Sequence, residues 1–157
     1  MGSLTEDGVS MDVKAAVALL GEGPSIAFYL LPFQPTAEEI AKLQADDSMW
    51  LLSKPSPDPK KWKNGPYGRV KLGWSFEKES VGDAKKATFY LYTYSVGKEG
   101  SNMNINKFGE GVDVSLAGSV KEGQQVTLTS KGSDTLMKST VAWDLKVTAK
   151  ILALKKN

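Results

Sequence analysis

The chain has 157 residues, with 20 Lys and Arg against 18 Asp and Glu, and it contains neither cysteine nor histidine. This length is typical of a single domain, spanning residues 1–157, that can bury a core without a disulfide or a metal. The missing side chains exclude cysteine nucleophiles, Ser-His-Asp triads and zinc sites built from Cys or His. We therefore expect no catalytic residue, no metal ligand and no cofactor.

The basic residues are almost all lysines, because Arg69 is the only arginine. Arginine is the preferred side chain for bidentate recognition of phosphates and bases, so we expect no specific nucleic-acid binding. No apolar run approaches the roughly 20 residues of a membrane-spanning helix, and no transmembrane segment is predicted.

The N-terminus begins with Met1-Gly2-Ser3, which looks like a remnant left by an expression vector, and no secretory signal follows it. We expect residues 1–8 and 155–157 to be mobile, as chain ends often are. The first clear pattern covers residues 9–20, where apolar and polar side chains alternate as in a strand. A turn-rich "GEGPS" and the apolar run 26–33 follow, which together predict a hairpin.

One short helix is predicted near residues 36–46. Thr36 and Glu39 have the T-x-x-E spacing of a capping box, and Pro35 precedes them. Ile40 and Leu43 fall on one side of this helix, which would give it a face to bury.

The stretch 54–68, "KPSPDPKKWKNGPYG", contains three prolines at alternating positions. Such a run favours polyproline II and could dock to an SH3-like partner, but a proline-stiffened connection between strands explains it without a partner, and we prefer that interpretation. Trp62 and Tyr67 have two interpretations. They either fold back to cap one end of the sheet, or they face outward as a contact surface.

Alternation returns over most of the remaining chain, and each run ends at a turn signal. The predicted strands cover residues 69–80, 87–96, 101–108, 112–120, 124–132 and 139–154. With the first hairpin this gives eight or nine strands. The expected fold is a mainly β antiparallel β-sandwich or partly open barrel with one short helix.

Three tyrosines, Tyr90, Tyr92 and Tyr94, share one face of the strand at 87–96. Tyrosine is amphipathic and rigid, and it is common at carbohydrate and protein interfaces. The alternative is that the short helix covers this face and the rings bury against Ile40 and Leu43.

Two further patterns point to surface positions. The acid pairs at positions 38–39 and 46–47 are adjacent in sequence and lack the across-cleft geometry of a glycosidase. Asparagines at positions 102, 104 and 106 form the polar face of a strand, where they could bond a sugar or simply face water.

The order of elements is similar to that of secreted bacterial all-β domains of uncharacterised function. The segments that carry this resemblance are "VSMDVKAAVALL" with "IAFYLLPF", "GVDVSLAGSV…QQVTLTS" and the closing "WDLKVTAKI". The resemblance covers most of the chain and implies an exported protein, periplasmic or secreted, whose targeting segment lies outside this sequence. A cytoplasmic location is the alternative.

Three hypotheses for function follow. The first is a non-catalytic all-β binding or protein-interaction module with a protein or carbohydrate partner, using Trp62, Tyr67, Tyr90, Tyr92 and Tyr94 as its contact surface. The second is a carrier of a small apolar ligand inside the barrel. The third is an enzyme that works with carboxylates, lysine or tyrosine.

Overall fold

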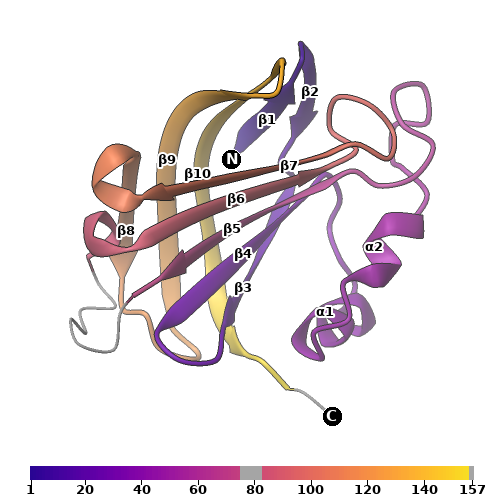
Figure 1. Cartoon of the computed structure of the whole chain (residues 1–157). Coiled ribbons are helices and arrows are strands. Elements are labelled where there is room, and N and C mark those ends of the chain that lie inside the picture. Colours follow the sequence, from indigo (N-terminus) through magenta and orange to yellow (C-terminus); the bar gives the residue numbers. More distant parts are fainter. Residues whose placement is uncertain (75–82, 156–157) are drawn as a thin grey trace.

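The computed structural model describes residues 1–74 and 83–155. Within them the chain forms ten β-strands, two α-helices and two 3₁₀ turns (Figure 1). In chain order they are β1 (Gly2–Glu6), β2 (Val9–Asp12), β3 (Ala15–Leu20), β4 (Ser25–Leu31), α1 (Ala37–Gln44), α2 (Met49–Ser53), β5 (Tyr67–Gly73), η1 (Ala84–Lys86), β6 (Thr88–Tyr94), β7 (Asn102–Phe108), η2 (Gly109–Gly111), β8 (Asp113–Gly118), β9 (Gln125–Leu136) and β10 (Ser139–Ala153). The prediction of a mainly β fold is confirmed, with ten strands instead of eight or nine.

The strands form one sheet that curls into a half-barrel. β3 to β7 pair antiparallel in chain order, and in Figure 1 they slant across the front of β9 and β10. β10 joins the two layers, because its last residues pair parallel to the end of β3. The rest of β10 pairs antiparallel with β1 on the same edge and with β9 on the other edge. β2 then extends β1, and β8 extends β9.

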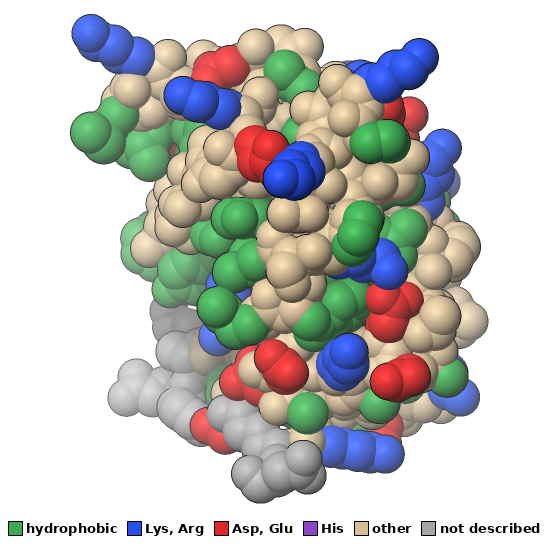
Figure 2. All heavy atoms as spheres, turned by 90° about the vertical axis from the view of Figure 1, so that its right-hand side faces the viewer, with side chains coloured by type: hydrophobic (Ala, Val, Ile, Leu, Met, Phe, Trp, Pro, Cys, Tyr) green, Lys and Arg blue, Asp and Glu red, His purple; other side chains and the backbone are tan. Residues whose placement is uncertain are grey.

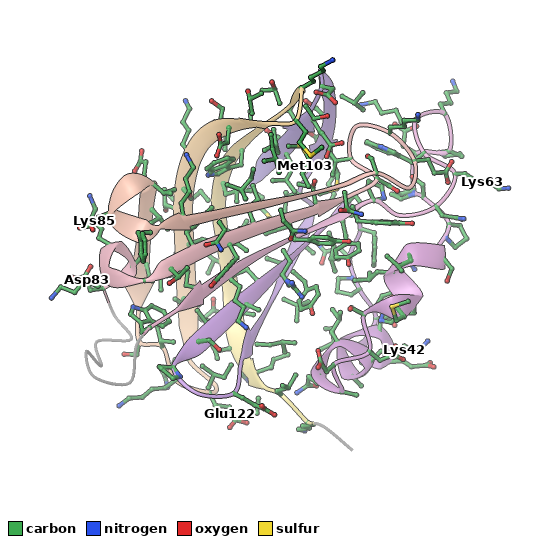
Figure 3. The ribbon with its side chains drawn as sticks, viewed as in Figure 1. Lys42, Lys63, Asp83, Lys85, Met103 and Glu122 are labelled. Atoms are coloured by element: carbon green, nitrogen blue, oxygen red, sulfur yellow. The ribbon has the colours of Figure 1, made fainter. Side chains whose placement is uncertain are left out.

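The core lies between the two layers and follows from the alternation of the strands. On β10 the inward positions are all buried, at 8% exposed or less: Val141, Trp143, Leu145, Val147, Ala149 and Ile151. The rings of Phe89 on β6 and Trp143 stack with their centroids 5.7 Å apart, so the two layers meet through aromatic contact. Met103 of β7 also points into this interior (Figure 3).

The two helices pack on the outer face of β3, β4 and the start of β5. Leu43 of α1 and Leu51 of α2 are buried there in a second apolar cluster with Val17, Leu19 and Tyr29. The predicted capping box is confirmed: Thr36 Oγ1 accepts from the Glu39 amide at 3.2 Å, and Glu39 Oε1 accepts from the Thr36 amide at 3.0 Å. Among the described residues no helix is long and apolar enough to cross a membrane.

Helix α2 was not predicted from the sequence, where residues 49–53 form only a short apolar run. Its five residues are too few to show a helical period. The single strand expected over residues 9–20 is also wrong. The chain changes partner between β2 and β3, since the Val13 amide donates to Gly2 O and the Lys14 amide donates to Leu31 O.

The expectation of a mobile N-terminus is wrong for residues 2–6. These residues form β1 between β2 and β10, and Leu4 is fully buried. Glu6 is only 2% exposed, and its carboxylate accepts hydrogen bonds from Thr93 Oγ1 at 2.8 Å and Ser101 Oγ at 3.0 Å. At the other end, Lys155 donates its amide to Gln44 O, while residues 156 and 157 lie outside the described residues, as does the predicted strand segment 75–80.

Candidate functional site

Trp62 lies inside the protein, at the end of the half-barrel. It is 4% exposed, it belongs to the core between the layers, and its indole Nε1 donates to Val96 O at 2.9 Å. The fold-back alternative therefore holds, and Trp62 cannot serve as an outward contact. The lysines beside it face water instead, and Lys63 points away from the protein (Figure 3).

The loop that carries Trp62 is closed on itself by backbone hydrogen bonds. The Ser56 amide donates to Lys63 O at 3.1 Å, and the Gly65 amide donates to Lys54 O at 2.8 Å. A polyproline II ligand keeps its backbone solvated, whereas this backbone is bonded within the loop. The geometry therefore favours a compact connection over a docking motif.

Tyr67 is also buried, at 6% exposed, as the first residue of β5. Its ring lies 6.5 Å from that of Tyr29 and 5.8 Å from those of Tyr92 and Tyr94. Burial, with a smaller effect of the neighbouring Tyr92, raises the pKa of the Tyr67 hydroxyl above its ordinary value. Tyr67 therefore forms part of the aromatic packing under the helices and does not face a partner.

The three tyrosines of β6 differ in exposure: Tyr90, near the start of the strand, is exposed, whereas Tyr92 and Tyr94 are half-buried. Tyr94 and Tyr92 are partly buried against the apolar cluster beneath α1 and α2, which includes Ile40 and Leu43. Tyr90 is 40% exposed and lies beyond that cluster. The apolar cluster beneath the helices thus includes two of the three rings, and the third lies outside it.

Strand register places unlike side chains next to these tyrosines. Lys71 of β5, Tyr90 and Asn106 of β7 form one row across three strands. The next row consists of Arg69, Tyr92 and Asn104. We call these six residues the open face. Neighbouring strands lie about 4.8 Å apart, so each row of three residues spans about 10 Å. Alternate residues on one strand are about 6.8 Å apart, which is the distance between the two rows.

The open face points outward because the intervening residues fill the core. Val70 and Leu72 on β5, and Phe89 and Leu91 on β6, are 1% exposed or less. Strict alternation then forces their neighbours to the opposite side of the sheet. The asparagines of β7 and Lys71 are exposed, whereas Arg69 and Tyr92 are half-buried.

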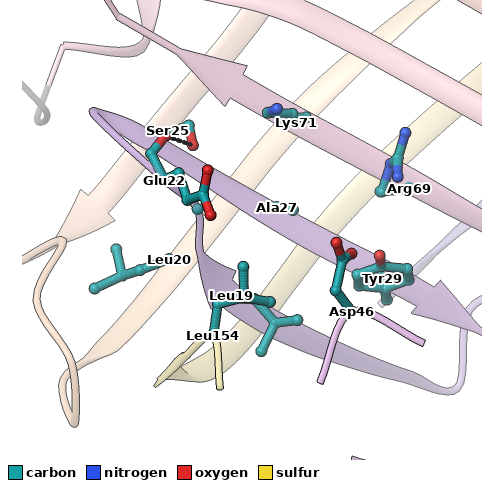
Figure 4. A pocket seen from close by; sticks show the side chains of 11 residues that line it. Leu19, Leu20, Glu22, Ser25, Ala27, Tyr29, Asp46, Arg69, Lys71 and Leu154 are labelled. Atoms are coloured by element: carbon teal, nitrogen blue, oxygen red, sulfur yellow. Dashed lines mark hydrogen bonds between the residues drawn. The ribbon is translucent and has the colours of Figure 1, made fainter. Parts of the chain in front are cut away.

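A cleft of about 330 Å³ borders the open face along β5 (Figure 4). Arg69 and Lys71 line it from β5, and the apolar side chains of Leu19 and Leu154 line another part of it. A second cleft, of about 380 Å³, lies next to Tyr90. Lys71, Glu22 and Ser25 line both clefts, so the two hollows adjoin at these residues.

The charges around the cleft are mixed. The Arg69 guanidinium carbon lies 5.7 Å from the centroid of the Tyr92 ring, within the range of a cation–π contact. Glu22 and Asp46 also line the cleft, and both are engaged in interactions of their own. On the side of the molecule that carries the helices, acidic and basic side chains are likewise interspersed (Figure 2).

Sequence reasoning identified the tyrosines and the asparagines but not their neighbours. Arg69 entered the sequence analysis only as the single arginine, and Lys71 only as part of an alternating strand, because alternation gives no information on which residues pair across strands. Within residues 1–74 and 83–155, no three acidic side chains are arranged to hold a metal ion.

The comparisons with known proteins identify no relative of this chain. No family model, no curated protein and no solved structure matches the chain.

Proposed function

We propose that the protein is a non-catalytic binding module that holds a carbohydrate chain on its open face. The observation that supports this most directly is the strand register, which sets a cation, a tyrosine and an asparagine side by side in two successive rows. Rigid β-strands present all six side chains, so little conformational order has to be gained on binding.

The tyrosines of β6 and the asparagines of β7 both have side-chain chemistry that fits a sugar. A tyrosine ring offers an apolar face for the C–H face of a pyranose and a hydroxyl at its edge. An asparagine amide both donates and accepts hydrogen bonds, as a sugar hydroxyl does. Protein interfaces, in contrast, are enriched in aromatic residues, Met and Arg around an apolar centre. The exposed asparagines along β7 therefore favour carbohydrate over protein as the partner.

The carrier alternative requires a hollow interior between the layers. Large side chains occupy that space, including Phe28 and Phe89 with no measurable exposure and Trp143 at 3%. This packing favours binding on the outside of the half-barrel. Native mass spectrometry of the purified protein checks the carrier hypothesis, which predicts a co-purified lipid or other apolar ligand.

A panel of soluble polysaccharides tests the proposal by affinity gel electrophoresis and titration calorimetry. At least one polysaccharide should bind, and Tyr90→Ala and Asn106→Ala should each weaken that binding about tenfold, which corresponds to roughly 1.4 kcal/mol. Lys146→Ala is the matched control, since this exposed side chain lies on β10, away from the open face. Unchanged affinity in both open-face variants would refute the site.

Export from the cytoplasm remains a proposal that fits a carbohydrate partner. Fractionation of the cells that produce the full-length protein would test it, and recovery only in the cytoplasm would contradict it.

A further inference from the structure

We propose that the carbohydrate is acidic, and that Arg69 and Lys71 bind carboxylate groups on its sugar residues. This inference rests on the proposed function and names the class of ligand. It starts from the position of the two cations, which lie two residues apart on β5 at the junction of the open face with the cleft.

Neither cation forms an ion pair within the described parts of the chain. The ion pairs among residues 1–74 and 83–155 join Lys54 to Glu39, Lys86 to Asp83, Lys107 to Asp134 and Lys131 to Asp144. Arg69 and Lys71 belong to none of them. A half-buried arginine without an ion-pair partner is a favourable place for an anionic ligand group.

Arg69 is held in a defined orientation. It is paired across the strands with Tyr29 on β4 and Tyr92 on β6, and its guanidinium lies over the Tyr92 ring. Tyr29 is 4% exposed and packed in the apolar cluster beneath the helices. The cation–π contact with Tyr92 does not use the N–H groups at the edge of the guanidinium, which can bind a planar, bidentate acceptor such as a carboxylate.

Lys71 extends the same charge along the strand. It is exposed, it pairs with Tyr90 in the neighbouring row, and it lines both clefts. Arg69 and Lys71 are about 6.8 Å apart along β5. A chain of acidic sugars lying along β5 and β6 would therefore meet one cation in each of the two rows, with a tyrosine beside it.

The surrounding acids limit how much negative charge the ligand can carry. Glu22 follows β3 and Asp46 follows α1, and both line the same cleft as the two cations. A densely sulfated chain would meet their repulsion, whereas a polymer with one carboxylate per sugar can place each carboxylate against β5. We therefore assign carboxylate, and not sulfate, as the ligand group.

The test compares polygalacturonate with its fully methyl-esterified form, which has the same backbone and no charge. Titration calorimetry with the full chain should show at least tenfold tighter binding of the charged polymer, and added salt should weaken that binding. Arg69→Gln and Lys71→Ala should each cost about tenfold for polygalacturonate and leave the methyl ester unaffected. Lys146→Ala should change neither affinity.

The outcomes separate this inference from the proposed function. Equal binding of both polymers, still weakened by Tyr90→Ala, would overturn the acidic ligand and keep the binding module. Tighter binding of dextran sulfate that is insensitive to Arg69→Gln would overturn it in favour of unspecific attraction of polyanions. Absence of binding to every polysaccharide would overturn both. Circular dichroism checks that each variant is folded, and Lys71→Ala at an exposed position keeps the test valid if Arg69→Gln does not fold.

Discussion

The outer face of strands β3 to β7 has two halves that share one pattern but have different surroundings. On the β3–β4 half, helices α1 and α2 cover the sheet, and Tyr29 is 4% exposed. On the β6–β7 half nothing in the described chain covers the sheet to the same extent, and Tyr90 is 40% exposed. Tyrosines on the same outer face, in neighbouring rows of the sheet, thus stabilise the fold in one half and remain available for contact in the other.

The difference shows that alternation alone does not separate a structural tyrosine from a functional one. Both halves place polar-tipped aromatic rings opposite the core. Their role depends on residues 32–66 between β4 and β5, which fold back over the sheet and form helices α1 and α2. The apolar cluster beneath these helices extends to Tyr92 and Tyr94 but does not include Tyr90. The following predictions test this division, beginning with the largest expected effect.

Leu43→Ala should have the largest effect, because it empties a fully buried position under the covered half. Loss of a buried leucine costs about 2–5 kcal/mol of unfolding free energy, from lost burial and the cavity left behind. Urea unfolding followed by tryptophan fluorescence measures this cost. A loss below about 0.5 kcal/mol would show that the helices contribute little to the stability of the fold.

Thr36→Ala should have an intermediate effect on the same half. It removes the N-cap acceptor of α1 and leaves the Glu39 amide without that partner. The expected loss is about 0.5–2 kcal/mol in the same unfolding experiment. Thr36→Ser keeps the hydroxyl and is the matched control, so equal losses in the two variants would contradict a capping role.

Lowering the pH should reduce the stability of the covered half, because Glu39 becomes protonated. The hydrogen bond from Lys54 at 2.7 Å, and next the Thr36 amide, hold the pKa of Glu39 below its ordinary value of 4.5. A lowered folded pKa gives stability that is complete above about 4.5 and is lost as the pH falls through the folded value. For this partly exposed pair the expected loss is about 0.2–1 kcal/mol.

Thermal unfolding at neutral pH and near pH 3 measures this acid effect. Glu39→Gln lacks the titrating group, so it should lose less stability than the parent chain between the two conditions. An identical loss in both proteins would assign the acid sensitivity to other groups, among them Asp134, whose pKa is lowered by Lys107 and next by the Thr135 amide.

Tyr90→Ala should have the smallest effect on stability, within about 0.5 kcal/mol, because the ring belongs to the open half. The same variant should weaken carbohydrate binding about tenfold, as proposed above. A loss of stability comparable to that of Leu43→Ala would show that the two halves do not differ in role.

Much of the fold could be predicted from the sequence, because local patterns report local structure. The capping box at Thr36 and Glu39 and the inward row on β10 were visible in single segments, and both are confirmed. Features that depend on distant partners were not visible. β1 looked like a terminal extension, since its partner β10 is more than a hundred residues away in the chain.

The candidate site shows the same limit. The stripe of tyrosines on β6 could be predicted from alternation, and so could the asparagines on β7. Their alignment with Arg69 and Lys71 requires the register between strands, which a single sequence does not encode as a local signal. The inward position of Trp62 likewise depends on a hydrogen bond to Val96, 34 residues further along the chain.

The position of β10 has a consequence for how the protein is made. This strand is translated after all the others, yet β1, β3 and β9 all pair with it. Until residues 139–153 leave the ribosome, the first and third strands lack the partner that joins the two layers, and the meander from β3 to β7 can form only as a separate unit. Completion of the half-barrel is therefore a late, long-range event, of the kind that makes β proteins fold in milliseconds to seconds.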